Sequence, residues 1–256
     1  MLHMLKEFQK DQLKVFVYGG RPEMGKAAAV DAADRIRKII GRKGFATAVF
    51  AAAPSQNEFL EELCKQDIDW SKVDAFHMDE YVGLDLDAPQ RFGNFLKEAI
   101  FKKLPFRSVH YIQQKGIDPE TSVREYEKLL TKNPPDLVFL GIGENGHLAF
   151  NDPGTADFED PRKVKIVTLD HTCRNQQVND GCFKTIDDVP KTAVTLTMSM
   201  LLSIPETVAI VPGSAKMEAV YKAVNDPVST SCPATALRNH PGAALYVDRD
   251  AGKKLL

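Results

Sequence analysis

Short apolar runs along the chain alternate with segments in which apolar residues recur every three or four positions. Eight of these runs are rich in β-branched residues and predict strands at 14–18, 47–53, 73–78, 109–112, 136–140, 165–169, 207–211 and 244–247. Several are apolar at nearly every position, which is typical of strands buried on both faces of a parallel sheet.

Helical spacing fills the intervals between the strands. Apolar residues at 28, 32, 36 and 40 share one helical face, and Gly41 is the expected end of that helix. A second helix is expected to begin at the N-cap Asp118, and a third is expected to take Ser214 as its N-cap. Because no repeat or linker interrupts this alternation, we predict a single α/β domain over 1–256, with a mostly parallel sheet.

Charge and cysteine content narrow the functional classes. The 256 residues include 33 Lys and Arg against 35 Asp and Glu, so the net charge is −2, and we expect neither nucleic acid nor a membrane surface as a partner. The four cysteines form no Cys-x-x-Cys pair, and no apolar run suits a membrane span or a signal peptide. We therefore expect a cytoplasmic protein with reduced thiols and without a cysteine zinc site.

Two short motif matches fail on their context. The segment 20–26 fits G-x-x-x-x-G-K, but Ala27 stands where a phosphate-binding loop needs Ser or Thr for magnesium. The segment 141–146 fits G-x-G-x-x-G, but Pro153 and Gly154 follow too closely for the helix that a dinucleotide site requires. The glycines of this second segment still predict close approach of the backbone to a ligand at a strand end.

Two strand ends carry candidate catalytic side chains. The predicted strand at 136–140 ends in a glycine turn that presents His147, either as a base or as a packed structural histidine. The strand at 73–78 ends in Asp79 and Glu80, which should point in different directions because strand side chains alternate. A solvated acidic turn is the alternative, whereas burial at the strand end would raise a carboxyl pKa toward the range of a general base.

Two helix starts are candidate anion sites. Lys216 lies in a first helical turn, where the helix dipole disfavours a cation, so a bound anion is one interpretation and a solvated lysine the other. Ser55 lies three residues before Glu58, which predicts a capping box, with phosphate binding as the second interpretation.

The motifs DEYVGL at 79–84 and GIGENGHLAFNDP at 141–153 resemble those of the glucosamine-6-phosphate deaminase/isomerase family. The related 6-phosphogluconolactonases share the Gly-His turn, but Tyr81 and the pair Phe150-Asn151 favour the deaminase side. The resemblance implies a three-layer Rossmann-like fold related to ribose-5-phosphate isomerase, and a small sugar phosphate as the partner.

The resemblance also implies roles. Asp79 would be the general base between sugar carbons C2 and C1, His147 would open the ring, and backbone donors near Gly143 would meet developing negative charge. Lys216 would hold the phosphate, together with Ser55 and Gln56. The implied reaction converts glucosamine 6-phosphate and water into fructose 6-phosphate and ammonia, with no metal or other cofactor.

The chain departs from the family pattern at several positions. Asn145 stands where many members have a carboxylate, and an amide can only orient the imidazole. Asp152 replaces a common glutamate and reaches less far, and Arg174 is the nearest candidate for the family's arginine. The basic residues of the family's effector site are not evident around 163–167, so we do not predict allosteric activation.

Other functions compatible with the fold are deamination of galactosamine 6-phosphate, hydrolysis of 6-phosphogluconolactone, and non-enzymatic sensing of a sugar phosphate. Retention of Asp79 and His147 argues against a sensor, whereas Asn145 keeps that hypothesis open. The family includes both small and hexameric assemblies, so a homo-oligomer remains possible.

Overall fold

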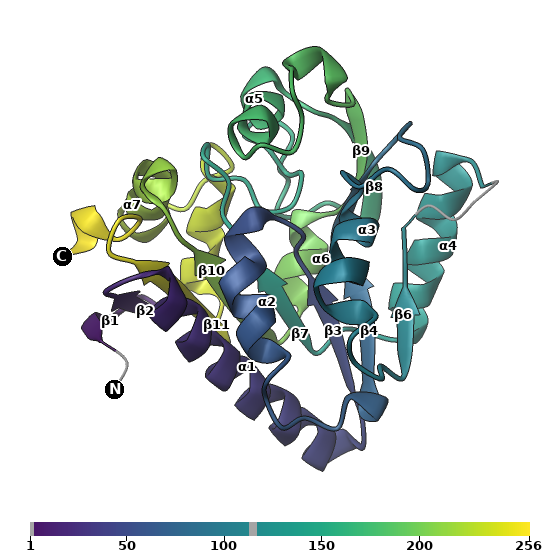
Figure 1. Cartoon of the computed structure of the whole chain (residues 1–256). Helices are drawn as coiled ribbons and strands as arrows, with labels where there is room; N and C mark the ends of the chain where they lie inside the picture. The colour runs from purple at the N-terminus through teal and green to yellow at the C-terminus, as the bar shows by residue number, and fades with distance from the viewer. Residues whose placement is uncertain (1–2, 113–116) are drawn as a thin grey trace.

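A computed structural model describes residues 3–112 and 117–256 and centres on an eight-stranded sheet (Figure 1). Its strand order is β1-β2-β11-β10-β7-β3-β4-β6. The strands are β1 (Met4–Lys10), β2 (Leu13–Tyr18), β11 (Ala243–Asp248), β10 (Glu206–Val211), β7 (Leu137–Leu140), β3 (Ala46–Phe50), β4 (Val73–His77) and β6 (Ser108–His110). From β2 to β6 every pair is parallel, and β1 pairs antiparallel with β2, so the expected mostly parallel sheet is confirmed.

A second, three-stranded antiparallel sheet lies beside the first. Its order is β5 (Asp79–Tyr81), β9 (Thr192–Leu196) and β8 (Val164–Thr168). Met78 connects the two sheets, because its amide donates to Phe50 O (3.3 Å) while its carbonyl accepts from Leu196 N (2.8 Å). The chain therefore changes sheet within one residue, immediately before Asp79.

Helices cover both faces of the large sheet and give the expected three layers. They are α1 (Arg21–Lys43), α2 (Asn57–Leu63), α3 (Phe92–Leu96), α4 (Pro119–Lys132), α5 (His171–Asn179), α6 (Met198–Ser203) and α7 (Met217–Asn225). Shorter 3-10 turns are η1 (Pro54–Gln56), η2 (Trp70–Lys72), η4 (Ile186–Asp188), η5 (Ser214–Lys216), η6 (Pro233–Asn239) and η7 (Lys253–Leu255), and a π-helical turn, η3 (Lys97–Phe101), extends α3. None of the helices in the described ranges is both long and apolar enough to cross a membrane.

Alternating side chains of the central strands supply two separate cores. In β7, Leu137 and Phe139 pack with α1 and α2, whereas Val138 and Leu140 pack on the opposite face with α4, α6 and α7. All four side chains are at most 1% exposed. This two-sided burial explains why the run 136–140 is apolar throughout.

Two expected helix ends are wrong. The first helix continues past Gly41 to Lys43, and Gly44 ends it with a φ of 86°, a left-handed conformation that suits glycine. Ser214 makes no capping bond, because α7 begins only at Met217, after the turn η5. The N-cap Asp118 is confirmed, since its side chain accepts a hydrogen bond from Thr121 N (3.0 Å).

Candidate active site

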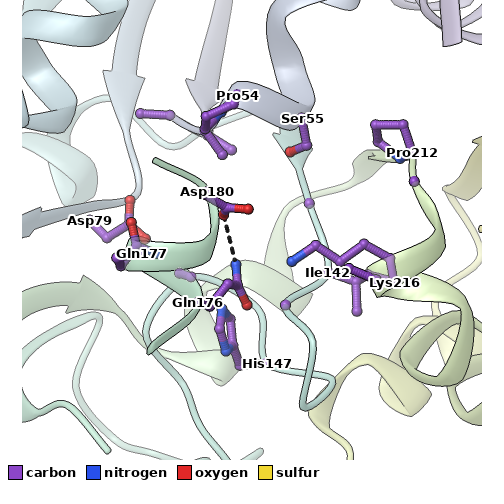
Figure 2. A pocket seen from close by; sticks show the side chains of 18 of the residues that line it. Pro54, Ser55, Asp79, Ile142, His147, Gln176, Gln177, Asp180, Pro212 and Lys216 are labelled. Atoms are coloured by element: carbon purple, nitrogen blue, oxygen red, sulfur yellow. Dashed lines mark hydrogen bonds between the residues drawn. The ribbon is translucent and has the colours of Figure 1, made fainter. Parts of the chain in front are cut away.

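The carboxyl ends of β3, β4, β7 and β10 open into one cavity of about 310 Å³ (Figure 2). Its walls come from the segment after β3, from Met78 and Asp79, from the glycine turn after β7, and from the turn after β10. Side chains of α5 and Asp180 cover another side. Ligands of open α/β folds bind at this edge of the sheet, so the placement agrees with the fold.

Asp79 forms one wall of the cavity and is the first residue of β5. It is 7% exposed, and burial together with the adjacent charge of Glu80 raises its pKa well above the ordinary value. Glu80 points elsewhere, because its carboxylate accepts hydrogen bonds from the amides of Tyr81 (2.9 Å), Phe92 (3.1 Å) and Gly93 (3.0 Å). The expected divergence of the two side chains is confirmed, and a solvated acidic turn is excluded.

His77 supports the backbone of Asp79 from inside the core. Its Nδ1 donates to Asp79 O (2.9 Å), while its Nε2 accepts from Ile112 N (2.9 Å). Burial lowers the pKa of His77 to about 4, so the ring is neutral near pH 7 and fits this donor–acceptor pattern. The hydroxyl of Tyr126 bonds both the amide (2.9 Å) and the carbonyl (2.8 Å) of His77. The general-base candidate therefore sits on a rigid strand end.

His147 faces the same cavity from the glycine turn and is 7% exposed. Its Nδ1 lies 2.9 Å from Oδ1 of Asp152, a carboxylate that is 1% exposed. A Cβ at Gly143 would fall 2.2 Å from Nε2 of the ring, so only glycine leaves room for the imidazole there. The histidine thus has a carboxylate behind it and the cavity in front.

Asn145 acts differently from the expected ring-orienting amide. Its Oδ1 accepts from the backbone amide of His147 (3.1 Å), and its Nδ2 donates to Oδ1 of Asp152 (3.0 Å). Asp152 reaches His147 despite its short side chain. Burial acts to raise the Asp152 pKa, but the His147 and Asn145 contacts outweigh it and hold that pKa below its ordinary value. Asn145 therefore positions the carboxylate rather than replacing it.

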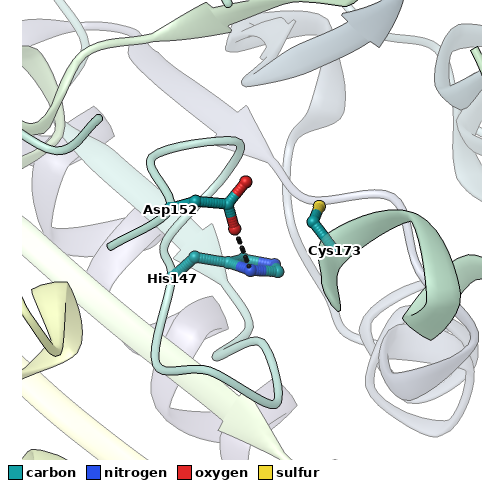
Figure 3. Close-up of side chains that lie close together, drawn as sticks. All are labelled: His147, Asp152 and Cys173. Atoms are coloured by element: carbon teal, nitrogen blue, oxygen red, sulfur yellow. Dashed lines mark ion pairs between the residues drawn. The ribbon is translucent and has the colours of Figure 1, made fainter. Parts of the chain in front are cut away.

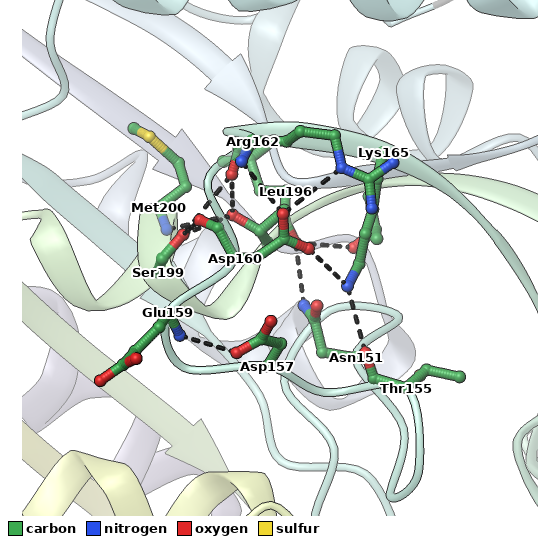
Figure 4. A network of polar contacts seen from close by, with 12 residues as sticks. Asn151, Thr155, Asp157, Glu159, Asp160, Arg162, Lys165, Leu196, Ser199 and Met200 are labelled. Atoms are coloured by element: carbon green, nitrogen blue, oxygen red, sulfur yellow. Dashed lines mark hydrogen bonds and ion pairs between the residues drawn. The ribbon is translucent and has the colours of Figure 1, made fainter.

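A network of polar contacts anchors the loop that follows Asp152 (Figure 4). The carbonyl of Asp152 accepts from the amides of Thr155 and Ala156, both at 2.9 Å. The buried ammonium of Lys165 donates to Thr155 O (3.1 Å) and to the carboxylate of Asp160 (3.0 Å). The loop bearing the histidine's partner is thereby tied to β8.

Lys216 supplies a cation to the opposite side of the cavity. It is 7% exposed, and its Nζ has no hydrogen-bond partner within the described part of the chain. Burial lowers its pKa, while the charges of Asp180 and Glu144 act in the opposite direction. An unpartnered buried ammonium is unfavourable unless an anion joins it. The solvated-lysine alternative is therefore excluded.

Ser55 lines the cavity near Lys216, but the expected capping box is wrong. Glu58 instead pairs with Nε and Nη2 of the Arg21 guanidinium, at 2.7 and 3.0 Å. Gln56 is outside the cavity lining, and its Nε2 donates to Ser55 Oγ (3.2 Å) and to Ile210 O (3.0 Å). Gln56 thus links the turn carrying Ser55 to β10.

Arg174 is not brought to the cavity. Its guanidinium donates to the carbonyls of Ile186 and Val189, which fastens α5 to the following segment. The cavity is instead lined by Gln176 and Gln177 of the same helix and by Asp180 just after it.

Gln176 connects α5 to the glycine turn that bears His147. Its Oε1 accepts from Glu144 N (2.9 Å), and its Nε2 contacts Asp180 Oδ2 at 3.4 Å (Figure 2). The sequence analysis did not predict Gln176 or Asp180 as site residues. It also missed Arg21, which lines the cavity and belongs to the rejected G-x-x-x-x-G-K segment. The mostly polar stretch 174–180 marks the segment in the sequence, but not which of its side chains face the cavity.

Comparison with known proteins shows which family the sequence matches. A family model described as glucosamine-6-phosphate isomerases/6-phosphogluconolactonase matches residues 20–246. A glucosamine-6-phosphate deaminase of Streptococcus pneumoniae serotype 4 is 34% identical over 208 residues, covering 81% of this chain and 87% of that protein.

Solved structures agree with the sequence matches. A monomeric glucosamine-6-phosphate deaminase superposes with a TM-score of 0.84 at 27% identity, covering 93% of this chain and 98% of that one. A 6-phosphogluconolactonase from Thermotoga maritima gives a TM-score of 0.75 at 19% identity, covering 92% and 99%, and this likeness shows the fold alone.

Proposed function

Because the chain belongs to the glucosamine-6-phosphate isomerase/6-phosphogluconolactonase family, we propose that it converts glucosamine 6-phosphate and water into fructose 6-phosphate and ammonia. One observation carries the proposal: a desolvated carboxylate, a carboxylate-backed histidine and a buried ammonium without a hydrogen-bond partner among the described residues line the same cavity. These are the groups that proton transfer on a phosphorylated sugar requires.

The phosphate binds at the Lys216 end. Its charge compensates the buried ammonium, and Ser55 offers a hydroxyl to the same cavity. The turn Gly213–Ala215 also lines this end. Anchoring the remote phosphate holds the sugar carbons toward Asp79 and His147, so binding energy is used to orient the reacting atoms.

His147 opens the sugar ring. Asp152 next to Nδ1 favours the tautomer with the proton on that nitrogen, which leaves Nε2 as the basic atom on the cavity side. Nε2 takes the proton of the C1 hydroxyl as the bond between C1 and the ring oxygen breaks, and the ring oxygen then receives a proton. The ionised Asp152 stabilises the transient imidazolium.

Asp79 then transfers a proton from C2 to C1. Because burial and Glu80 raise its pKa, the ionised form is a stronger base than an exposed aspartate. Loss of the C2 proton gives the enolate form of the enolamine, and return of that proton to C1, with transfer of one amine proton to the C1 oxygen, gives the ketose imine. Water adds to C2 of the imine and ammonia leaves, which yields fructose 6-phosphate.

The test is a paired product assay on wild-type protein. Ammonia and fructose 6-phosphate are measured together after incubation with glucosamine 6-phosphate, and equimolar release is expected. Galactosamine 6-phosphate and 6-phosphogluconolactone are assayed in parallel, because the lactone needs only water attack at C1 and does not require a base at C2.

Asp79→Asn is the matched variant, since it preserves shape and removes the base. We expect it to lower kcat about a thousandfold with glucosamine 6-phosphate. Turnover of the lactone with no release of ammonia by the wild type, or full deamination by Asp79→Asn, would contradict the proposal.

A further inference from the structure

Three chemically different side chains lie close together on the side of His147 that faces away from the cavity. His147, Asp152 and Cys173 each offer one ligand atom, and these atoms all lie within 4.8 Å of one another (Figure 3). The three residues are 7%, 1% and 1% exposed. Nδ1 of His147 is buried and, although it is close to Asp152, makes no well-aligned hydrogen bond to any described residue.

We propose that this cluster is an inhibitory binding site for a thiophilic divalent cation, of which Zn²⁺ is the representative. An imidazole nitrogen, a carboxylate oxygen and a thiolate sulfur are the ligands that zinc takes in proteins, and three of them leave a fourth position for water. Mg²⁺ and Ca²⁺ are disfavoured, because they require mostly oxygen ligands.

Charge balance and positioning both favour such an ion. The thiol releases its proton on binding, so one thiolate and one carboxylate neutralise the two positive charges. Cys173 is held in the first turn of α5, where its amide donates to Asp170 Oδ1 (2.6 Å). Asn145 bonds Oδ1 of Asp152 from outside the cluster, as residues around metal ligands do.

Inhibition follows from the tautomer of His147 and rests on the proposed function. A metal ion on Nδ1 occupies the lone pair of that nitrogen, so the ring proton must lie on Nε2. Nε2 is the atom that takes the proton of the C1 hydroxyl in the proposed ring opening. With the proton already there, the histidine cannot act as a base, and Asp152 is no longer free to stabilise an imidazolium.

The first experiment measures metal binding without relying on activity. Chelator-treated, reduced protein is titrated with Co²⁺, whose bond to a thiolate produces a near-ultraviolet charge-transfer band. We expect one equivalent to produce the band and Zn²⁺ to bleach it, because zinc binds such sites more tightly than cobalt. A wild-type protein that shows no band would overturn the proposal.

Matched cysteine variants locate the site. Cys173→Ser should lose the band and weaken zinc binding at least tenfold, since even residues around the ligands contribute about that much. Cys64→Ser is the control, because Cys64 is half-buried at the end of α2 and should change neither result. A band that persists in Cys173→Ser would overturn the assignment.

X-ray absorption of the zinc-loaded wild type identifies the atoms bound to zinc. It needs no substitution, so it is informative even where a variant fails to fold. We expect one sulfur at about 2.3 Å, with nitrogen and oxygen atoms completing the shell. A zinc shell without sulfur, or with more than one, would overturn the proposal without any substitution.

Activity is measured on the same samples. Zn²⁺ should abolish ammonia release in step with site occupancy, a chelator should restore it, and Mg²⁺ should have no effect. Full activity with the site occupied would overturn the inhibitory role. A protein that binds the metal but never releases ammonia would instead contradict the proposed function, because the cobalt spectrum does not depend on turnover.

Discussion

The two carboxylates of the proposed site, Asp79 in the cavity wall and Asp152 behind His147, have opposite environments. Asp79 is desolvated beside another acidic side chain, and its pKa is raised. Asp152 is also buried, but the contacts with His147 and Asn145 lower its pKa. Environments that push two carboxyl pKa values apart separate their chemical roles. The first suits a base that must pick up a proton, and the second suits a permanent anion behind a histidine.

The largest effect is expected at Asp79. A raised native pKa means that the folded protein binds this proton more tightly than the unfolded chain does, so the ionised group destabilises the fold near pH 7. Asp79→Asn should therefore lose about a thousandfold in kcat while its Tm stays equal or rises. Kinetics and thermal unfolding are measured on the same samples. A large fall in Tm would contradict the inference that the ionised Asp79 destabilises the fold.

Asp152→Asn should give the opposite sign in stability. A lowered native pKa means that the carboxylate stabilises the fold above its unfolded pKa and loses this contribution as the pH falls through its native pKa. We expect kcat to fall about a hundredfold and Tm to fall near pH 7, with the Tm difference from wild type shrinking below about pH 4. Thermal unfolding of both proteins over a range of pH measures this Tm difference. A difference that does not depend on pH would contradict the lowered pKa of Asp152.

Lys216→Met tests the opposite end of the cavity. A lost charge-assisted contact is worth about 1.5–3 kcal/mol, so KM should rise about ten- to hundredfold, with a smaller change in kcat. Since the ammonium is buried and has no hydrogen-bond partner among residues 3–112 and 117–256, Tm should not fall. Substrate-saturation curves provide the measurement. Unchanged KM with a reduced kcat would place the phosphate elsewhere.

Asn145→Asp should have the smallest effect, and it tests the contrast between Asp79 and Asp152 from the Asp152 side. The substitution replaces a donor 3.0 Å from Asp152 with a second carboxylate, which raises the Asp152 pKa by repulsion. We expect less than about a tenfold loss at the optimum pH, and an upward shift of the acidic limb of the kcat profile. A higher kcat at every pH would show that the amide is inferior to a carboxylate here.

The predictable parts of the molecule are those with a strong local pattern. Buried parallel strands showed as apolar runs, and the turns bearing Asp79 and His147 carried long motifs. The edge strand β1 was not predicted. Its side chains are exposed or only partly buried, so its sequence has no strong alternation of apolar and polar residues.

Site details that depend on packing between distant segments could not be predicted. Arg174, Gln176 and Gln177 are all polar residues of one short helix, and spacing alone cannot tell which of them faces the cavity. Asn145 and Asp152 act together because the loop folds back on itself, a fact that depends on tertiary contacts. Glu58 pairs with Arg21, from a helix far away in sequence, in place of the local cap.

The single-residue junction at Met78 has a consequence for the evolution of this enzyme. Since its amide is committed to one sheet and its carbonyl to the other, an insertion or deletion there would break one of these bonds or shift the register of Asp79 against β9. Length changes are far easier to accommodate in exposed loops such as 83–90. We therefore expect new substrate preferences to arise by changes in such exposed loops, while Asp79, the proposed base, keeps its place at the junction.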